Sequence, residues 1–438
     1  MKNIIIGAGP AGRLAGTELG RLGEKVLLIE KNNLGGTCLN EGCMVICALN
    51  DIAKFLNNKK QYEKLGLLKG NIEISFEEIV SKIIKTQEII HKIDHKENTS
   101  LNNDIVYGEA EITENEVTVQ GETWDFENLL IATGGKPFIP NVPGKEYGLT
   151  NEDILKLKEV PEKLNIIGGG VIASEISNIF ASFGSEVSII TRRGFLTKFD
   201  TEIRDYMVEN LFKNVNIYED TATEEIQKNK TIINVNGEIN ELEGTTFIAT
   251  GRSPNSQIAR TILNNDDFDK RGAIKVNDLL QTSKSNVYAA GDVIGGITLT
   301  PVARMEGILA ARNMAGYLNK IEYNTIPQSI PLAMDVSFVK NTNTLSDENK
   351  ETVDISVPGS AGPEGFWRVL SKDTGITKAS FDSKTRLLES ITAISPSSVS
   401  DISYLSYLMR TGENIINFDE FIEIHPSTDA FFQIMRDM

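Results

Sequence analysis

Two glycine-rich loops constrain the fold of this chain more strongly than any other feature. Residues 7–12 follow the pattern Gly-x-Gly-x-x-Gly, and residues 168–173 repeat it with alanine in the last place. Each loop lies between an apolar run and a helical pattern, and a second apolar run follows, which predicts a βαβ unit. Because about 160 residues separate the two units, we expect two dinucleotide-binding domains. The strands are predicted at 2–6, 25–30, 164–167 and 186–191.

The length and the charge of the chain limit its class. Its 438 residues exceed one ordinary core, and 40% hydrophobic with 24% charged residues is a soluble globular composition. The net charge of -17 argues against nucleic acid or an anionic membrane surface as the main partner. No apolar run approaches the ~20 residues of a membrane span, and a loop that begins at Gly7 leaves no room for a removable leader. We therefore expect a cytoplasmic protein.

Each glycine of the first loop has a physical role. Gly7 permits the tight turn, Gly9 lets the backbone approach a pyrophosphate, and Gly12 lets the helix pack closely on the sheet. The helix that begins at Pro10 offers free N–H groups to an anion, and Glu30 stands where a carboxylate accepts hydrogen bonds from ribose hydroxyls. The alternative is an ordinary tight turn, but strand, helix and acid in register favour a dinucleotide site. The corresponding residues of the second loop are Gly168, Gly170 and Ala173.

The strand after the second loop ends in residues that bear on the choice of nicotinamide. An NAD site usually places a carboxylate there, whereas this chain has Thr191, Arg192 and Arg193. Guanidinium groups suit a 2′-phosphate, so we predict NADPH, with NADH as the alternative. The competing interpretation is that both arginines are solvated surface charges.

All three cysteines of the chain, Cys38, Cys43 and Cys47, fall within ten residues. This grouping indicates local thiol chemistry in a reducing compartment rather than a scattered disulfide framework. A structural metal or iron–sulfur site would require about four ligands, and no further cysteine supplies one, so no metal is predicted. Buried structural thiols are the other alternative, but the Gly-Gly-Thr run before Cys38 favours redox chemistry.

Two further segments, 131–135 and 287–292, complete a pattern with the loops and the cysteines. The first is a strand that runs into small residues, and the second is a strand that ends in Gly-Asp. With these segments the chain resembles the pyridine nucleotide–disulfide oxidoreductases, which include dihydrolipoamide dehydrogenase, glutathione reductase and mercuric reductase, over nearly all of its length. The resemblance implies FAD at the first loop and a nicotinamide cofactor at the second. It also implies cofactor contacts from Gly36, Thr37, Ala132, Thr133, Gly134, Gly251, Arg252, Gly291 and Asp292, the last on the flavin ribityl chain.

The same resemblance assigns roles to the cysteines. Cys38 and Cys43 resemble the family's redox-active disulfide, in which Cys38 would meet the substrate and Cys43 would lie against the flavin. The implied function is an FAD-dependent NAD(P)H:disulfide oxidoreductase that acts on a small disulfide or dithiol, as dihydrolipoamide dehydrogenase does. Two alternatives stay open. One is the reduction of another acceptor, such as a glutathione-type disulfide, a quinone or a metal ion, and the other is a flavoprotein sensor that binds the cofactors.

The resemblance also implies an acid–base group near the end of the chain. His425 and Pro426 look like the family's His-Pro segment, in which the histidine serves the interchange thiol of the other subunit. A homodimer is therefore implied. The carboxylate that would orient the histidine is Asp429, one residue earlier and one methylene shorter than the family pattern. His91 and His95, on a polar helix, are expected at the surface.

Further departures from the family pattern follow the second cysteine. The family continues with Ile-Pro-Ser-Lys, whereas this chain has Met-Val-Ile-Cys and ends the run at Cys47. Glu175, which matches the partner of that lysine, is expected to be unpaired and to have a raised pKa. We hypothesise that Cys47 contacts the flavin region and alters its redox potential, and the alternative is a small residue that fills the lysine's space. The family's Thr-x-Pro-Glu segment is Ser-Ile-Pro-Leu at 329–332.

The predicted fold class is α/β, with two Rossmann-like dinucleotide-binding domains and an α+β C-terminal dimerisation domain. A helix is predicted at 76–97, two hairpin strands within 105–126, and strands at 366–370 and 387–394. The predicted domains are FAD-binding at 1–145 and 253–326, NAD(P)-binding at 146–252, and interface at 327–438.

Overall fold

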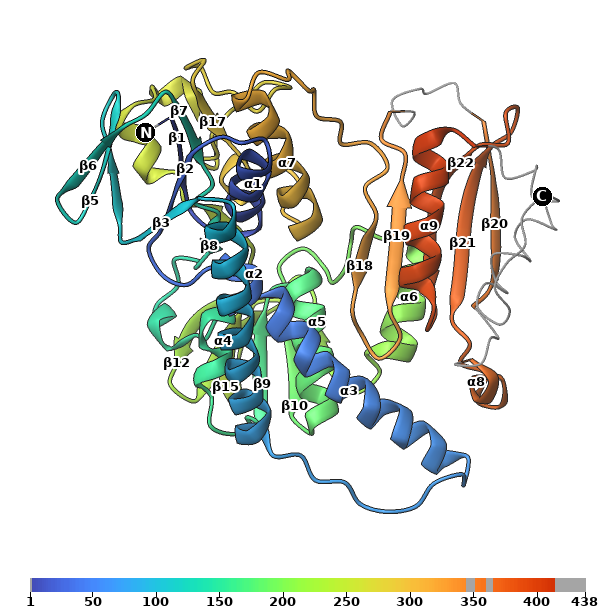
Figure 1. Ribbon diagram of the computed structural model, residues 1–438. Coiled ribbons are helices and arrows are strands. Elements are labelled where there is room, and N and C mark those ends of the chain that lie inside the picture. Colours follow the sequence, from blue (N-terminus) through green and yellow to red (C-terminus); the bar gives the residue numbers. More distant parts are fainter. Residues whose placement is uncertain (1, 344–350, 360–364, 414–438) are drawn as a thin grey trace.

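The computed structural model describes residues 2–343, 351–359 and 365–413 (Figure 1). Two parallel sheets with their helices lie one beside the other, and an antiparallel sheet formed by the C-terminal part stands next to both. The predicted α/β class is therefore confirmed. No helix among the described residues is both long enough and apolar enough to cross a membrane.

The first sheet has five parallel strands and contains the first glycine loop. Its elements are β1 (Asn3–Ile6), β2 (Val26–Glu30), β3 (Asp104–Tyr107), β7 (Asn128–Ile131), β17 (Val287–Ala289), α1 (Pro10–Arg21) and α7 (Thr300–Met314). The strand order is β17-β7-β1-β2-β3. Ile5 on the central strand pairs with Leu28 on one side and Leu130 on the other. Because β17 pairs with β7, a segment from far along the chain brings its loop to the carboxyl end of the first sheet.

The second sheet repeats this arrangement with four parallel strands. Its elements are β9 (Lys163–Ile167), β10 (Glu186–Ile190), β11 (Val215–Tyr218), β15 (Thr245–Ile248), α5 (Val171–Phe183) and the short α6 (Thr201–Tyr206). The strand order is β11-β10-β9-β15, so the glycine loop after β9 lies in the middle of the sheet. The central strands are almost fully buried, which explains why they read as continuous apolar runs.

Short antiparallel strands form small additional sheets beside the two parallel sheets. Those in the segment 105–126 differ from the prediction. The strands are β4 (Ala110–Ile112), β5 (Glu116–Val119), β6 (Glu122–Asp125), β8 (Gly135–Pro137), β12 (Ala222–Gln227), β13 (Lys230–Val235), β14 (Glu238–Glu243) and β16 (Arg252–Pro254). Instead of two hairpin strands, the segment forms the edge strand β3 and then a three-stranded meander. The cause is Gly108, whose φ of 149° ends β3, and a turn at Gln120 and Gly121, where φ is also positive.

The C-terminal sheet is antiparallel, in the order β18-β19-β22-β21-β20. Its strands are β18 (Gln328–Ile330), β19 (Val336–Lys340), β20 (Thr352–Pro358), β21 (Ile376–Asp382) and β22 (Leu388–Ile394), and α9 (Ser398–Thr411) packs on β19 and β22. The strand predicted at 387–394 is confirmed as β22.

The strand predicted at 366–370 is wrong, because this segment forms the helix α8 (Phe366–Ser371). Its aromatic and branched residues suggested a strand by propensity. In the structure, however, Arg368 is the buried residue, and its guanidinium forms an ion pair with Asp373 at 3.3 Å and a hydrogen bond to Asn58 at 3.2 Å. This polar anchor on one face of a helical turn overrides the strand preference.

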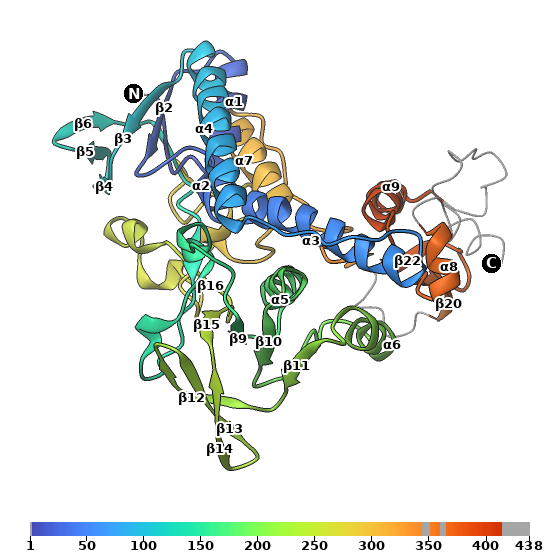
Figure 2. The ribbon, with the colours of Figure 1, turned by 90° about the horizontal axis from the view of Figure 1, so that it is seen from below.

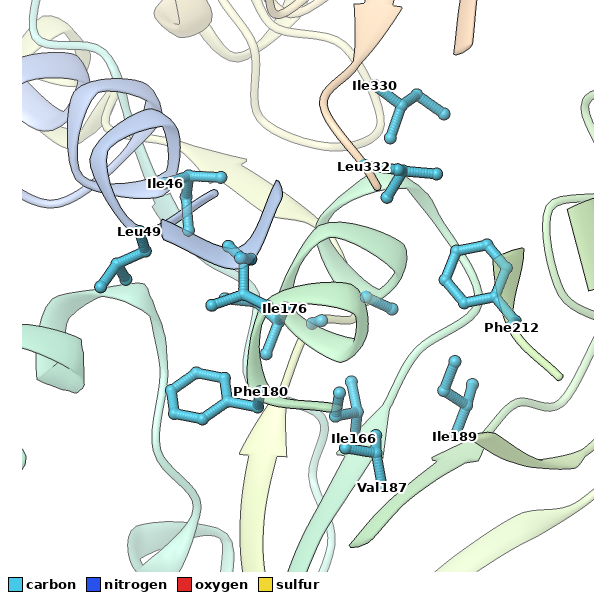
Figure 3. Close-up of a cluster of buried hydrophobic side chains, with 14 of the residues drawn as sticks. Ile46, Leu49, Ile166, Ile176, Phe180, Val187, Ile189, Phe212, Ile330 and Leu332 are labelled. Carbon is cyan, nitrogen blue, oxygen red and sulfur yellow. The ribbon is translucent and has the colours of Figure 1, made fainter. Parts of the chain in front are cut away.

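One long helix, α3 (Cys43–Lys64), connects all three sheets (Figures 1 and 2). Figure 3 shows Ile46 and Leu49 of α3 close to Ile176 of α5, in a cluster that also takes in Ile330 and Leu332 from the C-terminal part. The predicted helix at 76–97 is present as α4 (Phe76–Ser100), and α2 (Gly36–Asn40) precedes α3.

Polar contacts fix α3 within this packing. Asn178 of α5 donates to Asn50 of α3 at 3.0 Å and accepts from the Ala333 N–H at 3.1 Å, and both asparagines are buried. Lys54 of α3 forms an ion pair with Asp335 at 2.7 Å. The helix that begins at Cys43 is therefore held from two sides.

Candidate functional site

A single cavity of about 2240 Å³ joins the two glycine loops to the cysteines. The loops after β1 and β9 reach it from the carboxyl ends of the two parallel sheets, which is where open α/β sheets bind ligands. All three cysteines line the same cavity. The predicted site residues on its wall are Gly7, Gly9, Pro10, Glu30, Gly36, Thr37, Cys38, Cys43, Ala132, Thr133, Gly134, Gly168, Gly170, Glu175, Arg192, Arg193, Gly251, Arg252, Gly291 and Asp292.

The first loop is shaped by close backbone approaches. A Cβ on Gly12 would stand 1.8 Å from the Gly7 carbonyl oxygen, so only glycine fits there, and Gly12 itself is buried behind the loop. The Glu30 carboxylate accepts the Ala8 N–H at 2.7 Å and the Asn32 N–H at 2.8 Å. Glu30 therefore organises two loops at the edge of the cavity, in addition to any contact with a ribose.

The second loop ends at the N-terminus of α5, where Gly170 is the N-cap residue and Ala173 is fully buried against the sheet. Thr191 is buried, and its hydroxyl donates to the Gly194 carbonyl at 3.0 Å, which holds the turn after β10. Arg192 and Arg193 are exposed on the cavity wall beside this loop. The structure thus brings both guanidinium groups to the second loop, at the end of the strand where a ribose would lie.

The residues around the two loops fit the dinucleotides that the sequence implies. Among the described residues, no heavy atom lies within 4 Å of a Cβ built on Gly134 or Gly170, so side chains there would project into the cavity. The first N–H groups of α1 and α5 face this space without a side-chain cap, as a pyrophosphate site requires. Both loops can therefore hold a phosphate at a helix N-terminus.

The two predicted redox cysteines meet at the junction of α2 and α3. Cys38 lies on α2 and is half-buried, and Cys43 is the first residue of α3 and is exposed to the cavity. Both sulfurs are free thiols on the cavity wall. The Thr300 hydroxyl lies 3.5 Å from the Cys43 sulfur. The two thiols are close enough for each to shift the pKa of the other.

The interaction between the two thiols shifts their pKa values in opposite directions. Hydrogen bonding from the Cys43 thiol lowers the pKa of Cys38 to about 6 against the opposing effect of burial, and Thr300 and the Arg304 guanidinium lower it as well. The same interaction, together with desolvation, raises the pKa of Cys43. The pair therefore favours a single negative charge, which the two sulfurs share.

Cys47 and Glu175 stand on the same wall, next to Cys43. Burial raises the pKa of Glu175 to about 8, and the Cys43 charge adds to this effect, in agreement with the shift that sequence analysis expected. Burial also raises the pKa of Cys47, and Cys43 and Glu175 add to it. This part of the cavity therefore favours neutral side chains.

The loop after β17 is held by residues on both sides. Arg252 and Asp292 form an ion pair at 3.3 Å, and Arg252 also donates to the Gly135 carbonyl. Glu306 of α7 is buried, and its carboxylate accepts the Gly291 N–H at 2.6 Å and the Tyr323 hydroxyl at 2.8 Å. Burial raises the pKa of Glu306 to about 7. Glu306 was not predicted as a site residue, although it is the one acid within the apolar pattern of 300–314.

The three predicted histidines lie in two parts of the chain. His425 and Asp429 lie outside the described residues. His95 is exposed, as expected, but His91 is half-buried, and its Nε2 lies 2.7 Å from the Asn40 Oδ1, so the surface placement predicted for His91 is wrong. The reason is that α4 packs its polar face against the turn that carries Cys38.

Comparisons with known proteins bear on the family and on the fold. Residues 1–307 match the family model described as pyridine nucleotide-disulphide oxidoreductase. An uncharacterized protein of Methanocaldococcus jannaschii is 33% identical over 100% of this chain and 98% of its own length. The dihydrolipoyl dehydrogenase of Bacillus subtilis is 29% identical over 97% of this chain and 93% of its own length. The HOCl-induced flavoprotein disulfide reductase RclA from Escherichia coli shares the fold, with a TM-score of 0.86 and 24% identity over 100% of both chains.

The unequal thiols predict how Cys38 reacts with pH. In the reduced protein, alkylation of Cys38 by iodoacetamide should rise with pH through a midpoint near 6, well below the ordinary thiol pKa of about 8.5, because the thiolate is the nucleophile. Cys43→Ala removes the hydrogen-bond donor and should move this midpoint upward. Alkylation rates for each cysteine, resolved by mass spectrometry, measure the effect. Cys47→Ala should move the midpoint only slightly downward, because Cys47 has a small opposing effect on the pKa of Cys38. An ordinary midpoint in the unmodified protein would contradict the assignment.

Proposed function

The chain belongs to the pyridine nucleotide-disulphide oxidoreductases, and from that premise we propose that it passes electrons from NADPH through FAD to Cys38 and Cys43, and from these to a small disulfide. One observation carries the proposal: the free thiols of Cys38 and Cys43 lie on the wall of the cavity that both glycine loops line. FAD, when bound at the first loop, supplies the two-electron transfer from nicotinamide to sulfur.

The two thiols act in sequence, Cys38 on the substrate disulfide and Cys43 on the mixed disulfide that results. The Cys38 thiolate attacks one sulfur of the substrate disulfide, which forms a mixed disulfide and releases the first substrate thiolate. The Cys43 thiol then loses its proton and attacks the Cys38 sulfur, which closes the Cys38–Cys43 disulfide and releases the second substrate thiolate. The substrate gains two electrons from the pair and one proton from the Cys43 thiol, and the second proton that makes it a dithiol is taken up from solvent. We assign the proton transfer to His425, oriented by Asp429, from the second subunit of a homodimer.

The domains follow from the same proposal. We assign residues 1–145 and 253–326 to FAD binding, since β17 joins the sheet of the first loop. We assign 146–252 to NAD(P) binding and 327–438 to the subunit interface. The substrate we propose is lipoamide-like, because the cysteine stretch at 35–43 most resembles that of dihydrolipoamide dehydrogenase. A glutathione-type disulfide, a quinone or a metal ion is the alternative acceptor.

Anaerobic reduction tests the electron path. Addition of NADPH should produce a long-wavelength absorption band from a thiolate beside the flavin, and one disulfide in a panel of lipoamide, glutathione disulfide and coenzyme A disulfide should discharge it. Cys38→Ser should keep the flavin and abolish turnover with that disulfide, because no thiolate attacks the substrate. Quinones and Cu(II) complete the panel. A protein that shows neither the band nor turnover with any acceptor would refute the proposal and favour a sensor.

Arg192 and Arg193 should determine the preference for NADPH. The double variant Arg192→Ala/Arg193→Ala should raise the KM for NADPH at least about tenfold, because it removes charge-assisted hydrogen bonds to the 2′-phosphate. The KM for NADH should change little. Steady-state kinetics with both nucleotides measure the ratio, and Arg410→Ala, an exposed arginine away from the cavity, is the control. Equal effects on both nucleotides would show that the arginines are solvated surface charges.

Cys47 should influence the flavin if it contacts the flavin region. We expect Cys47→Ser to shift the flavin spectrum and reduction potential, since Cys47 lies one helical turn from Cys43 and lines the cavity. Cys47→Lys should have a larger effect, because an ammonium group beside Glu175 would lower the pKa of that carboxyl. If the Cys47→Ser variant has the same flavin spectrum and reduction potential as the unmodified protein, Cys47 only fills space.

A further inference from the structure

The turn that carries Cys38 is held by side chains from α4, which lies far from it in the sequence. Gln87 donates its Nε2 to the Leu39 carbonyl at 2.8 Å and to the Asn40 carbonyl at 3.1 Å. His91, one helical turn further along α4, places its Nε2 2.7 Å from the Asn40 Oδ1. Both contacts reach the two residues that directly follow Cys38.

The other hydrogen bonds of Asn40 determine which residue is the donor in the contact between His91 and Asn40. The Asn40 Nδ2 lies 2.9 Å from the Gly36 carbonyl and 3.1 Å from the Leu34 carbonyl. Carbonyl oxygens only accept, so the amide NH₂ faces them and the Oδ1 faces His91. An amide oxygen also only accepts, and therefore the His91 Nε2 must carry a proton and donate. Both a neutral ring with this tautomer and a charged ring can do so.

The turn requires an external support because its own structure is short and flanked by glycines. α2 has five residues, too few to be stable by themselves. Gly35 and Gly36 at its start have φ values of 91° and 57°, and Gly42 separates its end from α3. Cys43 is fixed by the packing of α3, so the distance between the two sulfurs depends on how α2 is held.

We propose that His91 is a positioning residue for Cys38: its Nε2–H donates to Asn40 and holds α2 where the Cys38 sulfur meets Cys43. His91 does not line the cavity, so it acts through Asn40 and not on the substrate. The inference rests on the proposed function, since it concerns the thiol pair that passes electrons. It adds a residue outside the cysteine motif to the machinery of the pair.

Two replacements for His91 with side chains of similar volume distinguish the effect of the hydrogen bond from the effect of packing. His91→Met fills similar volume without a donor, and His91→Gln supplies an N–H at a similar reach. His91→Met should slow the alkylation of Cys38 at pH 7, and the closure of the Cys38–Cys43 disulfide, by about three- to tenfold, the worth of one hydrogen bond. His91→Gln should restore both rates to within about twofold. His95→Met, on the exposed side of the same helix, is the matched control and should have no effect.

The readouts distinguish the two proposals. Alkylation of Cys38 depends on thiol geometry and not on turnover, so it tests His91 even if no disulfide in the panel is a substrate. Flavin content and the reduction of flavin by NADPH should be unchanged in all His91 variants. Rates in His91→Met equal to those of the unmodified protein, or an equal loss in His91→Gln, would overturn the positioning role. Loss of turnover in every protein, with the alkylation pattern intact, would instead overturn the proposed function.

Discussion

The burial of α3 between α5 and the C-terminal part is the constraint on which the site depends. Ile46 and Leu49 lie within one apolar cluster with residues of the second sheet and of 330–336, so the helix cannot shift without opening that cluster. Because Cys43 is the first residue of α3, the packing fixes its position relative to both glycine loops. Cys38 lies on the separate short helix α2. The two thiols thus lie on one helix held by the core and on one short helix between glycines.

The parallel sheets explain why the loops converge on this pair. In each sheet the glycine loop follows a central strand, and the helix after it presents free N–H groups at the carboxyl edge. β17 adds the loop at Gly291 and Asp292 to the first edge, where Glu306 and Arg252 hold it from opposite sides. A chain with net charge -17 can therefore offer phosphate sites, since backbone dipoles and local arginines determine the field in the cavity.

Local patterns predicted most of the site, and contacts between distant segments account for what was missed. The glycine loops, the cysteines and the Gly-Asp loop are short runs whose chemistry depends on neighbours in the sequence, so they could be read directly. His91 could not, because its partner Asn40 lies on a turn about 50 residues earlier. Glu306 likewise depends on Gly291 and Tyr323. The strand prediction for 366–370 was wrong because Arg368 is anchored by Asn58 of α3. Local residue propensities carry no information about a contact between segments so far apart in the sequence.

Cys47, which stands where the family pattern has a lysine, affects how charge is stabilised beside Cys43. With Cys47 in its place, Glu175 has a pKa of about 8 and is mostly protonated at neutral pH. No fixed ion pair then stands beside Cys43 in the described part of the cavity wall. The charge on Cys38 is instead stabilised chiefly by neutral donors, the Cys43 thiol and the Thr300 hydroxyl, with Arg304 as the contributing cation. Because neutral donors act only at hydrogen-bond distance, the reactivity of this pair depends on geometry more than a pair beside a lysine would.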